Sequence, residues 1–282
     1  MTAAGASPGR STLARPALSP PGLLGASALV VRRNLTHIRR MPELLLDVTI
    51  QPVMFVLLFA FVFGSSIDVP GTSYREWLVP GIMAQTMVFS SFIVALGLNT
   101  DLEKGIVDRL KSLPVPRPTI LVGRSISSLI HSSIGVSVMA ATGLLIGWRV
   151  RDGVLSAVAA FGLLLAFGFA MIWVGIWIGS LMRSAEAVNG VGFTVMFPLT
   201  FLANTFAPTS TMPSALRTLA EWNPVSALTQ SLRELWGNAP AAPASASWPL
   251  HHAELVTLCW SLLITAVFAP LALAAFRARS RD

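Results

Sequence analysis

The chain has 282 residues, of which 54% are hydrophobic and only 12% are charged, and its mean hydropathy is +0.68. A soluble domain usually carries about a quarter charged residues, so this chain has too little polar surface to cover a water-soluble globule. The composition therefore predicts a membrane protein. The single cysteine, Cys259, excludes an intrachain disulfide and a zinc site built from several cysteines.

The first 41 residues differ in composition from the rest of the chain. Residues 1–22 are small, polar and proline-rich, which predicts a disordered tail without a signal-peptide core. Apolar residues then recur at helical spacing over 23–41, with arginines on the other faces. This pattern is typical of an amphipathic helix at a membrane surface, although a soluble docking helix shows it too.

Six apolar stretches follow, each bounded by turn residues or charges and each able to form a membrane-spanning helix of about 20 residues. We therefore expect an all-α integral membrane protein in which 42–282 form one six-helix domain. The third and fourth stretches are long enough to tilt or to extend past the bilayer. The predicted spans are 44–63, 78–98, 120–147, 154–181, 188–206 and 254–276.

The chain has a net charge of +7, and its basic residues lie mostly on one side of the predicted spans. If the amino terminus is cytoplasmic, fifteen of the 20 basic residues lie inside and five lie outside, which agrees with the positive-inside rule. Both termini are then cytoplasmic, and the high charge gives no reason to expect a nucleic-acid partner. The outer five are Arg75, Arg149, Arg151, Arg217 and Arg233.

The loop between the second and third spans carries the most information. Thr100 and Glu103 have the spacing of a capping box, which predicts a cytoplasmic helix over 100–113 that begins at this point. Pro114 ends the helix. Its apolar stripe must be buried against the membrane, its own bundle or a partner. That stripe consists of Leu102, Ile106, Leu110 and Leu113.

The same loop has an incomplete resemblance to a phosphate-binding loop. The stretch 105–112 begins with Gly105 and has lysine and serine at its end, but Leu110 stands where the second glycine belongs. Leu110 continues the helical stripe, so we expect no nucleotide site and no cofactor in this chain.

Between the fifth and sixth spans lie helices that are too short to cross a bilayer. Asn223 and Pro224 are an N-cap and a first helical residue, and Gly237 ends that helix. We expect these helices, over 213–236, to dip into the outer leaflet or to lie on it.

Polar groups at membrane depth are costly, which makes them candidates for a substrate path. Asp47 and Gln51 lie one turn apart on the first span, and His131 lies on the third among several serines. Trp173 and Trp177, one turn apart on the fourth span, could stack on a planar aromatic drug. Structural roles compete with each of these: capping of a helix end, hydrogen bonds between helices, and core packing.

Two glycine pairs in the spans have the spacing that permits close helix approach. They are Gly143 with Gly147, and Gly175 with Gly179.

Four segments together resemble the type-2 ABC exporter permeases, and most closely the daunorubicin resistance permeases. They occur in order within a resemblance that covers roughly 23–276. The segments are Leu102-Glu-Lys-Gly-Ile-Val-Asp-Arg-Leu-Lys-Ser-Leu-Pro, Met182-Arg-Ser-Ala-Glu-Ala-Val, Phe197-Pro-Leu-Thr-Phe-Leu-Ala-Asn and Asn223-Pro-Val-Ser.

The resemblance implies a six-helix subunit that pairs with a second permease, the same or a sister chain, and with two copies of a separate ATPase. ATP and Mg²⁺ then belong to the ATPase. The family's interfacial helix corresponds to 23–41, and its outer re-entrant helices correspond to 213–236. Its coupling helix corresponds to 102–114, so the ATPase contacts would be Leu102, Glu103, Lys104, Gly105, Asp108, Arg109, Lys111 and Pro114.

Three classes of function are compared. We favour a non-enzymatic permease of an ATP-driven exporter in the bacterial plasma membrane, which moves a drug, an antibiotic or a lipid outward and confers antibiotic resistance. An ion-coupled secondary transporter is the alternative, but that class tends to show repeated halves with sites near the midplane, and no repeat is evident. A membrane enzyme would need paired carboxylates, a metal set or a nucleophile with its base, and we identify none of these.

Overall fold

The computed structural model describes residues 50, 53–64, 69, 71–106, 117–238 and 246–279. The predicted tail at 1–22 and the predicted amphipathic helix at 23–41 lie outside these ranges. The described part is mostly helical and contains no strand. Its elements are η1 (Phe59–Phe63), α3 (Tyr74–Glu103), α5 (Arg117–Ile146), α6 (Gly153–Leu181), α7 (Ala185–Phe201), η2 (Thr209–Thr211), α8 (Ser214–Glu221), α9 (Pro224–Leu235), α10 (Trp248–His251) and α11 (Ala253–Arg279).

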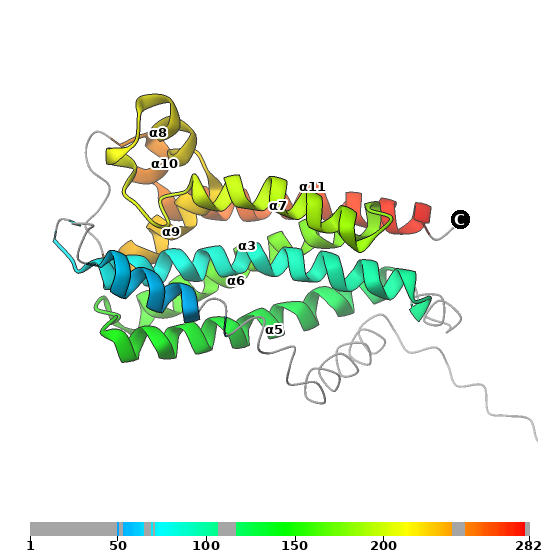
Figure 1. The fold of residues 1–282 in the computed structure, drawn as a ribbon, viewed down its shortest axis with the longest axis horizontal. Coiled ribbons are helices and arrows are strands. Elements are labelled where there is room, and N and C mark those ends of the chain that lie inside the picture. The colour runs from blue at the N-terminus through cyan, green and yellow to red at the C-terminus, as the bar shows by residue number, and fades with distance from the viewer. Residues whose placement is uncertain are drawn as a thin grey trace, which may run out of the picture.

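The long helices α3, α5, α6, α7 and α11 run along the length of the molecule (Figure 1). The short helices α8, α9 and α10 gather at one end, which we call the α9 end. The last residues of α3 and α11 lie at the opposite end, which we call the tail end. Since α6 packs mainly against α3 and α11, these three helices form the centre of the bundle.

Within the described ranges, four helices are long and apolar enough to cross a membrane: α3, α5, α6 and α11. They coincide with the second, third, fourth and sixth predicted spans. The 30 residues of α3 make a rod of about 45 Å, which exceeds the roughly 30 Å of a bilayer core. Of the first predicted span, the structure describes a short apolar helix over Val53–Val62, so the count of six spans stays a prediction.

The fifth predicted span, 188–206, was misplaced along the sequence. α7 begins at Ala185, because the Ser184 hydroxyl caps it by accepting a hydrogen bond from the Ala187 amide at 3.2 Å. It ends at Phe201 after 17 residues. The chain then leaves the helix, and the backbone carbonyls of Asn204 and Thr205 turn toward a buried arginine instead of continuing the helical ladder.

Close contact between α3 and α6 depends on the predicted glycine pair Gly175 and Gly179. A Cβ atom at Gly179 would lie 2.5 Å from the Ala95 carbonyl oxygen, and one at Gly175 would collide with the Ser91 carbonyl. This pair therefore has the packing role that its spacing predicts. The other pair differs: Gly143 packs against Val79, whereas Gly147, at a φ of +107°, forms the turn that ends α5.

The helices predicted over 213–236 are present as α8 and α9, but α9 is not a surface helix. All nine residues from Val225 to Arg233 are buried, and α9 packs against α3, α6 and α11. Its expected caps are confirmed, since the Asn223 side chain accepts a hydrogen bond from the Val225 amide at 2.8 Å and Gly237 follows at a φ of +67°. The Asn223 amide also donates to the Leu199 carbonyl at 2.7 Å, which fixes α9 to α7.

Candidate coupling end, clamp and substrate path

The predicted ATPase-contacting segment starts at the tail end, where α3 ends. Glu103 and Lys104 are exposed there, and Leu102 is half-buried. The Lys104 amide donates to the Thr100 carbonyl at 3.0 Å, and Gly105 follows with a φ of +64°, a conformation that favours glycine. The described part of the segment is thus a charged, exposed helix end. Four of its predicted residues, Asp108, Arg109, Lys111 and Pro114, lie outside the described residues.

The start predicted for the cytoplasmic helix, at Thr100, was wrong. Thr100 and Glu103 lie in the last turn of α3, which runs unbroken from Tyr74, so neither residue belongs to a capping box. The helix continues past Thr100 because its buried side persists through Leu98 and Asn99, which are 1% and 0% exposed. Packing of α3 on its neighbours therefore overrides the local capping pattern.

Hydrogen bonds from distant residues hold the tail end together. α6 ends at Leu181, where its last carbonyls lack helical partners. The Asn99 side-chain amide of α3 donates to the Met182 carbonyl at 2.7 Å, and the Arg279 guanidinium of α11 donates to the same carbonyl. An ion pair between Asp101 and Arg124 joins α3 to α5. Four helices thus meet beside Glu103 and Lys104.

Of the residues predicted to line a substrate path, the structure describes His131, Trp173 and Trp177. Asp47 and Gln51 lie outside the described residues, and His131 is half-buried on α5. Trp173 is 5% exposed and packs edge-on against Phe169, with ring centroids 6.2 Å apart. Trp177 packs against Phe268 of α11 at 5.2 Å. Packing within this chain therefore occupies both tryptophans.

The serines around His131 hydrogen-bond within their own helix. Ser125, Ser127 and Ser133 donate to carbonyls three or four residues earlier on α5, at 2.7–2.9 Å. Serine hydroxyls in apolar helices commonly donate their hydrogen bond to a carbonyl of the preceding turn. These hydrogen bonds of Ser125 and Ser133 therefore stay within α5 and do not join it to another helix.

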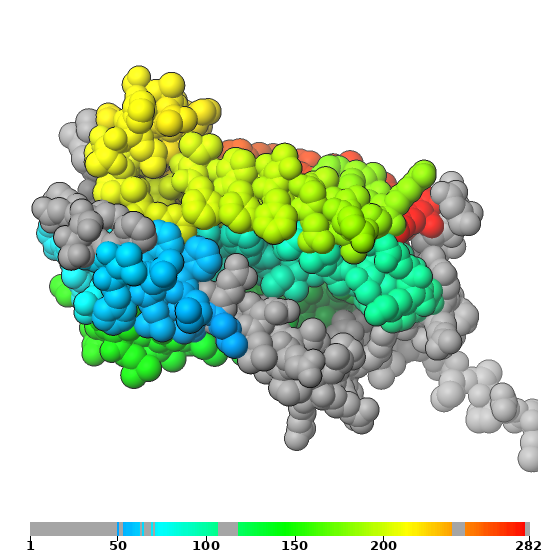
Figure 2. Space-filling view, viewed as in Figure 1, coloured from blue at the N-terminus to red at the C-terminus, as the bar shows by residue number. Residues whose placement is uncertain are grey.

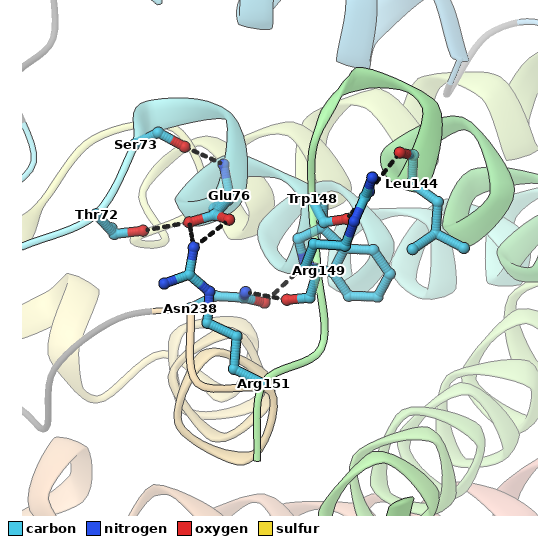
Figure 3. Close-up of polar contacts among 8 residues, drawn as sticks. All are labelled: Thr72, Ser73, Glu76, Leu144, Trp148, Arg149, Arg151 and Asn238. Atoms are coloured by element: carbon cyan, nitrogen blue, oxygen red, sulfur yellow. Dashed lines mark hydrogen bonds and ion pairs between the residues drawn. The ribbon is translucent and has the colours of Figure 1, made fainter. Parts of the chain in front are cut away.

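At the α9 end, polar side chains from three parts of the chain form a network that we call the clamp: Glu76, Trp148, Arg151 and Asn238 (Figure 3). The Arg151 guanidinium donates to both Glu76 carboxylate oxygens, at 2.6 and 2.9 Å. The Trp148 indole donates to the Asn238 side-chain oxygen at 2.6 Å. The clamp therefore fastens the start of α3, the α5–α6 connection and the residues after α9 to one another.

Arg233 adds a buried cation next to the clamp. It is 1% exposed, its Nε donates to the Trp77 carbonyl at 2.8 Å, and its Nη2 donates to the Asn204 and Thr205 carbonyls at 2.9 and 3.3 Å. The guanidinium carbon also lies 3.4 Å from the centroid of the Trp77 ring. Its described partners are thus backbone carbonyls and an aromatic face, which join α9 to α3 and to the segment after α7.

The sequence patterns missed Arg233 and the clamp. Arg233 was counted among the outer basic residues because it lies between the fifth and sixth predicted spans, and its burial between Leu232 and Trp236 was not predicted. The one signal in the sequence for this burial was a charged residue within an apolar helical face. Nothing local links Glu76 to Arg151, because these two residues meet only after α3 and α5 have packed.

These features define an α-helical, multi-pass membrane protein whose helix α3 extends from a polar clamp to an exposed charged turn. The chain belongs to the ABC-2 type transporter family, whose sequence pattern matches residues 27–235. That match covers the long helices α3, α5, α6 and α7 but not α11.

Three relatives show what the chain is similar to. The daunorubicin resistance ABC transporter permease protein DrrB1 of Streptomyces coeruleorubidus is 30% identical over 89% of this chain and 88% of its own length. The probable doxorubicin resistance permease DrrC of Mycobacterium tuberculosis H37Rv is 24% identical over 76% of this chain and 80% of its own. The probable multidrug permease YbhR of Escherichia coli K12 is 25% identical over 74% of this chain but only 54% of its own length.

Proposed function

We propose that this chain is the membrane-spanning permease subunit of an ATP-driven exporter that moves a hydrophobic or amphiphilic compound out of the cell. Antibiotic resistance is the expected consequence. Membership of the ABC-2 type transporter family supports this proposal, as does the likeness to permeases named for resistance to daunorubicin and doxorubicin.

The observation that carries the proposal is the continuity of α3. One helix of 30 residues joins an exposed, charged end at Glu103 and Lys104 to the clamp residue Glu76. A rigid helix transmits a displacement along its axis, because each backbone hydrogen bond resists bending. A partner that pushes on the tail end would therefore move the clamp end of the same rod.

The proposed partner at the tail end is an ABC ATPase, in two copies, which would bind ATP and Mg²⁺. A second permease, the same or a sister chain, would complete the transporter. We further propose six spans in the bacterial plasma membrane, with both termini and the tail end facing the cytoplasm and the α9 end facing outward. Arg124, Arg183, Arg277 and Arg279 then lie on the cytoplasmic side, as the positive-inside rule requires.

Efflux from living cells tests the proposal against an ion-coupled transporter. The chain is expressed with its ATPase in a drug-sensitive bacterium, and cell-associated daunorubicin fluorescence is followed after a protonophore is added. We expect efflux to persist while ATP is supplied by fermentation and to stop when the catalytic carboxylate of the ATPase is neutralised. Efflux that the protonophore abolishes at unchanged ATP levels would instead indicate ion coupling.

A further inference from the structure

Arg233 carries a positive charge that no acidic residue of the described ranges neutralises. The ion pairs that the structure shows between described residues belong to Arg124 and Arg151. Glu234, the next residue on α9, accepts a hydrogen bond from Gln230 at 2.7 Å instead. A buried charge is costly without a counter-charge, and the carbonyls around Arg233 offer hydrogen bonds but no net charge. The surroundings of Arg233 therefore favour an anion.

The guanidinium of Arg233 also has donors to spare. Its Nε and Nη2 donate to the carbonyls of Trp77, Asn204 and Thr205, whereas Nη1 has no acceptor within the described residues. An arginine has five N–H groups, and two of them are on Nη1. These two donors are available to a bound group.

Three neighbouring side chains have buried polar atoms without a partner in the part of the chain that the structure describes: Asn204 Oδ1, Thr205 Oγ1 and Thr229 Oγ1. Their residues are 4%, 0% and 0% exposed. The first two adjoin Arg233 through their own carbonyls. Thr229 precedes Arg233 by one turn of α9 and so lies on the same side of that helix.

The chemistry of these three side chains suits an anion next to the guanidinium. Both threonine hydroxyls can donate a hydrogen bond. The Asn204 carboxamide can donate as well, once its nitrogen and oxygen exchange places by a flip about the last side-chain bond. Buried polar atoms normally have a hydrogen-bond partner, so their gathering around a buried cation indicates a bound group.

The packing around Arg233 admits only a very small group. Phe206, which follows Thr205, stacks on Phe59 with ring centroids 4.5 Å apart. Figure 2 shows residues 53–64 and α7 on the same face of the molecule. On the side of α3, a Cβ atom at Gly81 would lie 2.7 Å from the Thr205 carbonyl oxygen. A carboxylate or phosphate carried by a larger compound has no room between these segments, whereas a monoatomic anion does.

We infer that Arg233, Thr205 and Thr229 form a buried chloride site, which ties α9 to α3 and to the segment after α7. Chloride accepts several hydrogen bonds at once and balances the charge of the guanidinium, whereas a water molecule in the same place would leave that charge unbalanced. Bound chloride should therefore stabilise the α9 end. This inference goes beyond the export function and does not depend on it.

Thermal unfolding of the full chain in detergent tests the site, with sodium chloride compared with sodium gluconate at equal ionic strength. Gluconate is too large for a buried site, and it screens surface charges as chloride does. The test variants are Thr205→Val and Thr229→Val, which keep the shape of the side chain and remove the hydroxyl. Thr86→Val is the matched control, because Thr86 is 8% exposed and its hydroxyl already donates to the Ile82 carbonyl at 2.8 Å.

In about 150 mM salt, we expect chloride to raise the unfolding midpoint of the wild type by about 2–4 °C relative to gluconate. Thr86→Val should show the same difference between the two salts. Each test variant should show less than the wild type, and the Thr205→Val/Thr229→Val variant should show none. Bromide, which is also monoatomic, should replace chloride in the wild type.

Equal midpoints of the wild type in the two salts would overturn the inference and would indicate that water occupies the site. An equal chloride effect in the wild type and the double variant would overturn it too, because the ion would then bind elsewhere on this basic chain. If the variants do not fold, the chlorine NMR line in the presence of the wild type decides: broadening that bromide reverses and gluconate does not supports the site, and a line that the protein leaves unchanged contradicts it. Export enters neither measurement, so a failed chloride site leaves the proposed function standing.

Discussion

Arg233 connects three parts of the chain through one side chain: α9, α3 and the segment that follows α7. A buried guanidinium is costly, and it is tolerated here because three carbonyls and the Trp77 ring surround it. Gly81 makes room for this arrangement, because a Cβ atom at Gly81 would lie 2.7 Å from the Thr205 carbonyl oxygen.

Replacing Arg233 by methionine should destabilise the protein strongly. The change leaves the Trp77, Asn204 and Thr205 carbonyls without their donor in a dry interior, and we expect a loss of about 2–5 kcal/mol in the free energy of unfolding. Thermal unfolding of the detergent-solubilised protein measures the effect. Arg75→Met is the control, since Arg75 is exposed. Equal stability of the two variants would contradict the role given to Arg233.

The clamp ion pair should contribute less to stability than Arg233 does. Glu76 is buried, but the Arg151 side chain is 58% exposed, so water screens the pair. A double-mutant cycle with Glu76→Gln and Arg151→Met should give a coupling energy of about 0.2–1 kcal/mol. A coupling energy of zero would mean that the two residues lie close together without stabilising the α9 end.

Sequence patterns predicted those residues whose role depends on the backbone next to them. Asn223 and Gly237 are examples, since a cap and a left-handed turn involve only neighbouring amides and carbonyls. The same logic failed at Thr100, where the capping pattern is present but long-range packing keeps α3 helical. Asn99 and Arg279 could not be predicted, because their shared acceptor, Met182, is distant in sequence from both.

At the scale of elements, the second, third, fourth and sixth spans were predictable because their hydropathy marks them. The bounds of α3, α5, α6 and α11 follow the apolar stretches, with a few added residues at their ends. The helix α9 was predicted, but its burial was not, because its buried side includes Thr229, Gln230, Ser231 and Arg233. A buried helix whose packed side is partly polar has no distinct signal in a periodicity of apolar residues.

The α3–α6 contact provides a test with a matched control in one helix. Gly179→Ala should destabilise the protein by about 1–3 kcal/mol, because its methyl group would overlap the Ala95 carbonyl and push the helices apart. At Gly162 a Cβ atom meets nothing within 4 Å, so Gly162→Ala should be neutral or stabilising by up to about 1 kcal/mol. Thermal unfolding of both variants measures these changes in stability. Equal destabilisation of the two would count against close packing at Gly179.

The exposed end of α3 provides a test of the proposed coupling between the ATPase and export. Glu103→Ala or Gly105→Ala should lower ATP-dependent export severalfold while the amount of protein inserted in the membrane stays unchanged. Glu103 is exposed and Gly105 has a left-handed conformation, so either change alters the surface offered to a partner without opening the core. Glu254→Ala, an exposed position at the opposite end, is the control. Normal export by both tail-end variants would contradict the assigned contact.

On the scale of the whole molecule, the surroundings of α3 change along its length. Its tail end is charged and exposed, its middle is packed on α6 through Gly175 and Gly179, and its other end is fastened by the clamp and by Arg233. The α9 end should therefore move as one unit when α3 moves.

The central claim is that this chain transports a compound only when a separate ATPase drives it. The most direct test is a reconstitution of the purified chain in proteoliposomes, with and without its ATPase, in which ATP hydrolysis and movement of daunorubicin are recorded together. We predict that the chain alone hydrolyses no ATP and moves no drug, and that the two proteins together do both. Hydrolysis by the chain alone, or drug movement by the complete complex that is independent of ATP, would contradict the account.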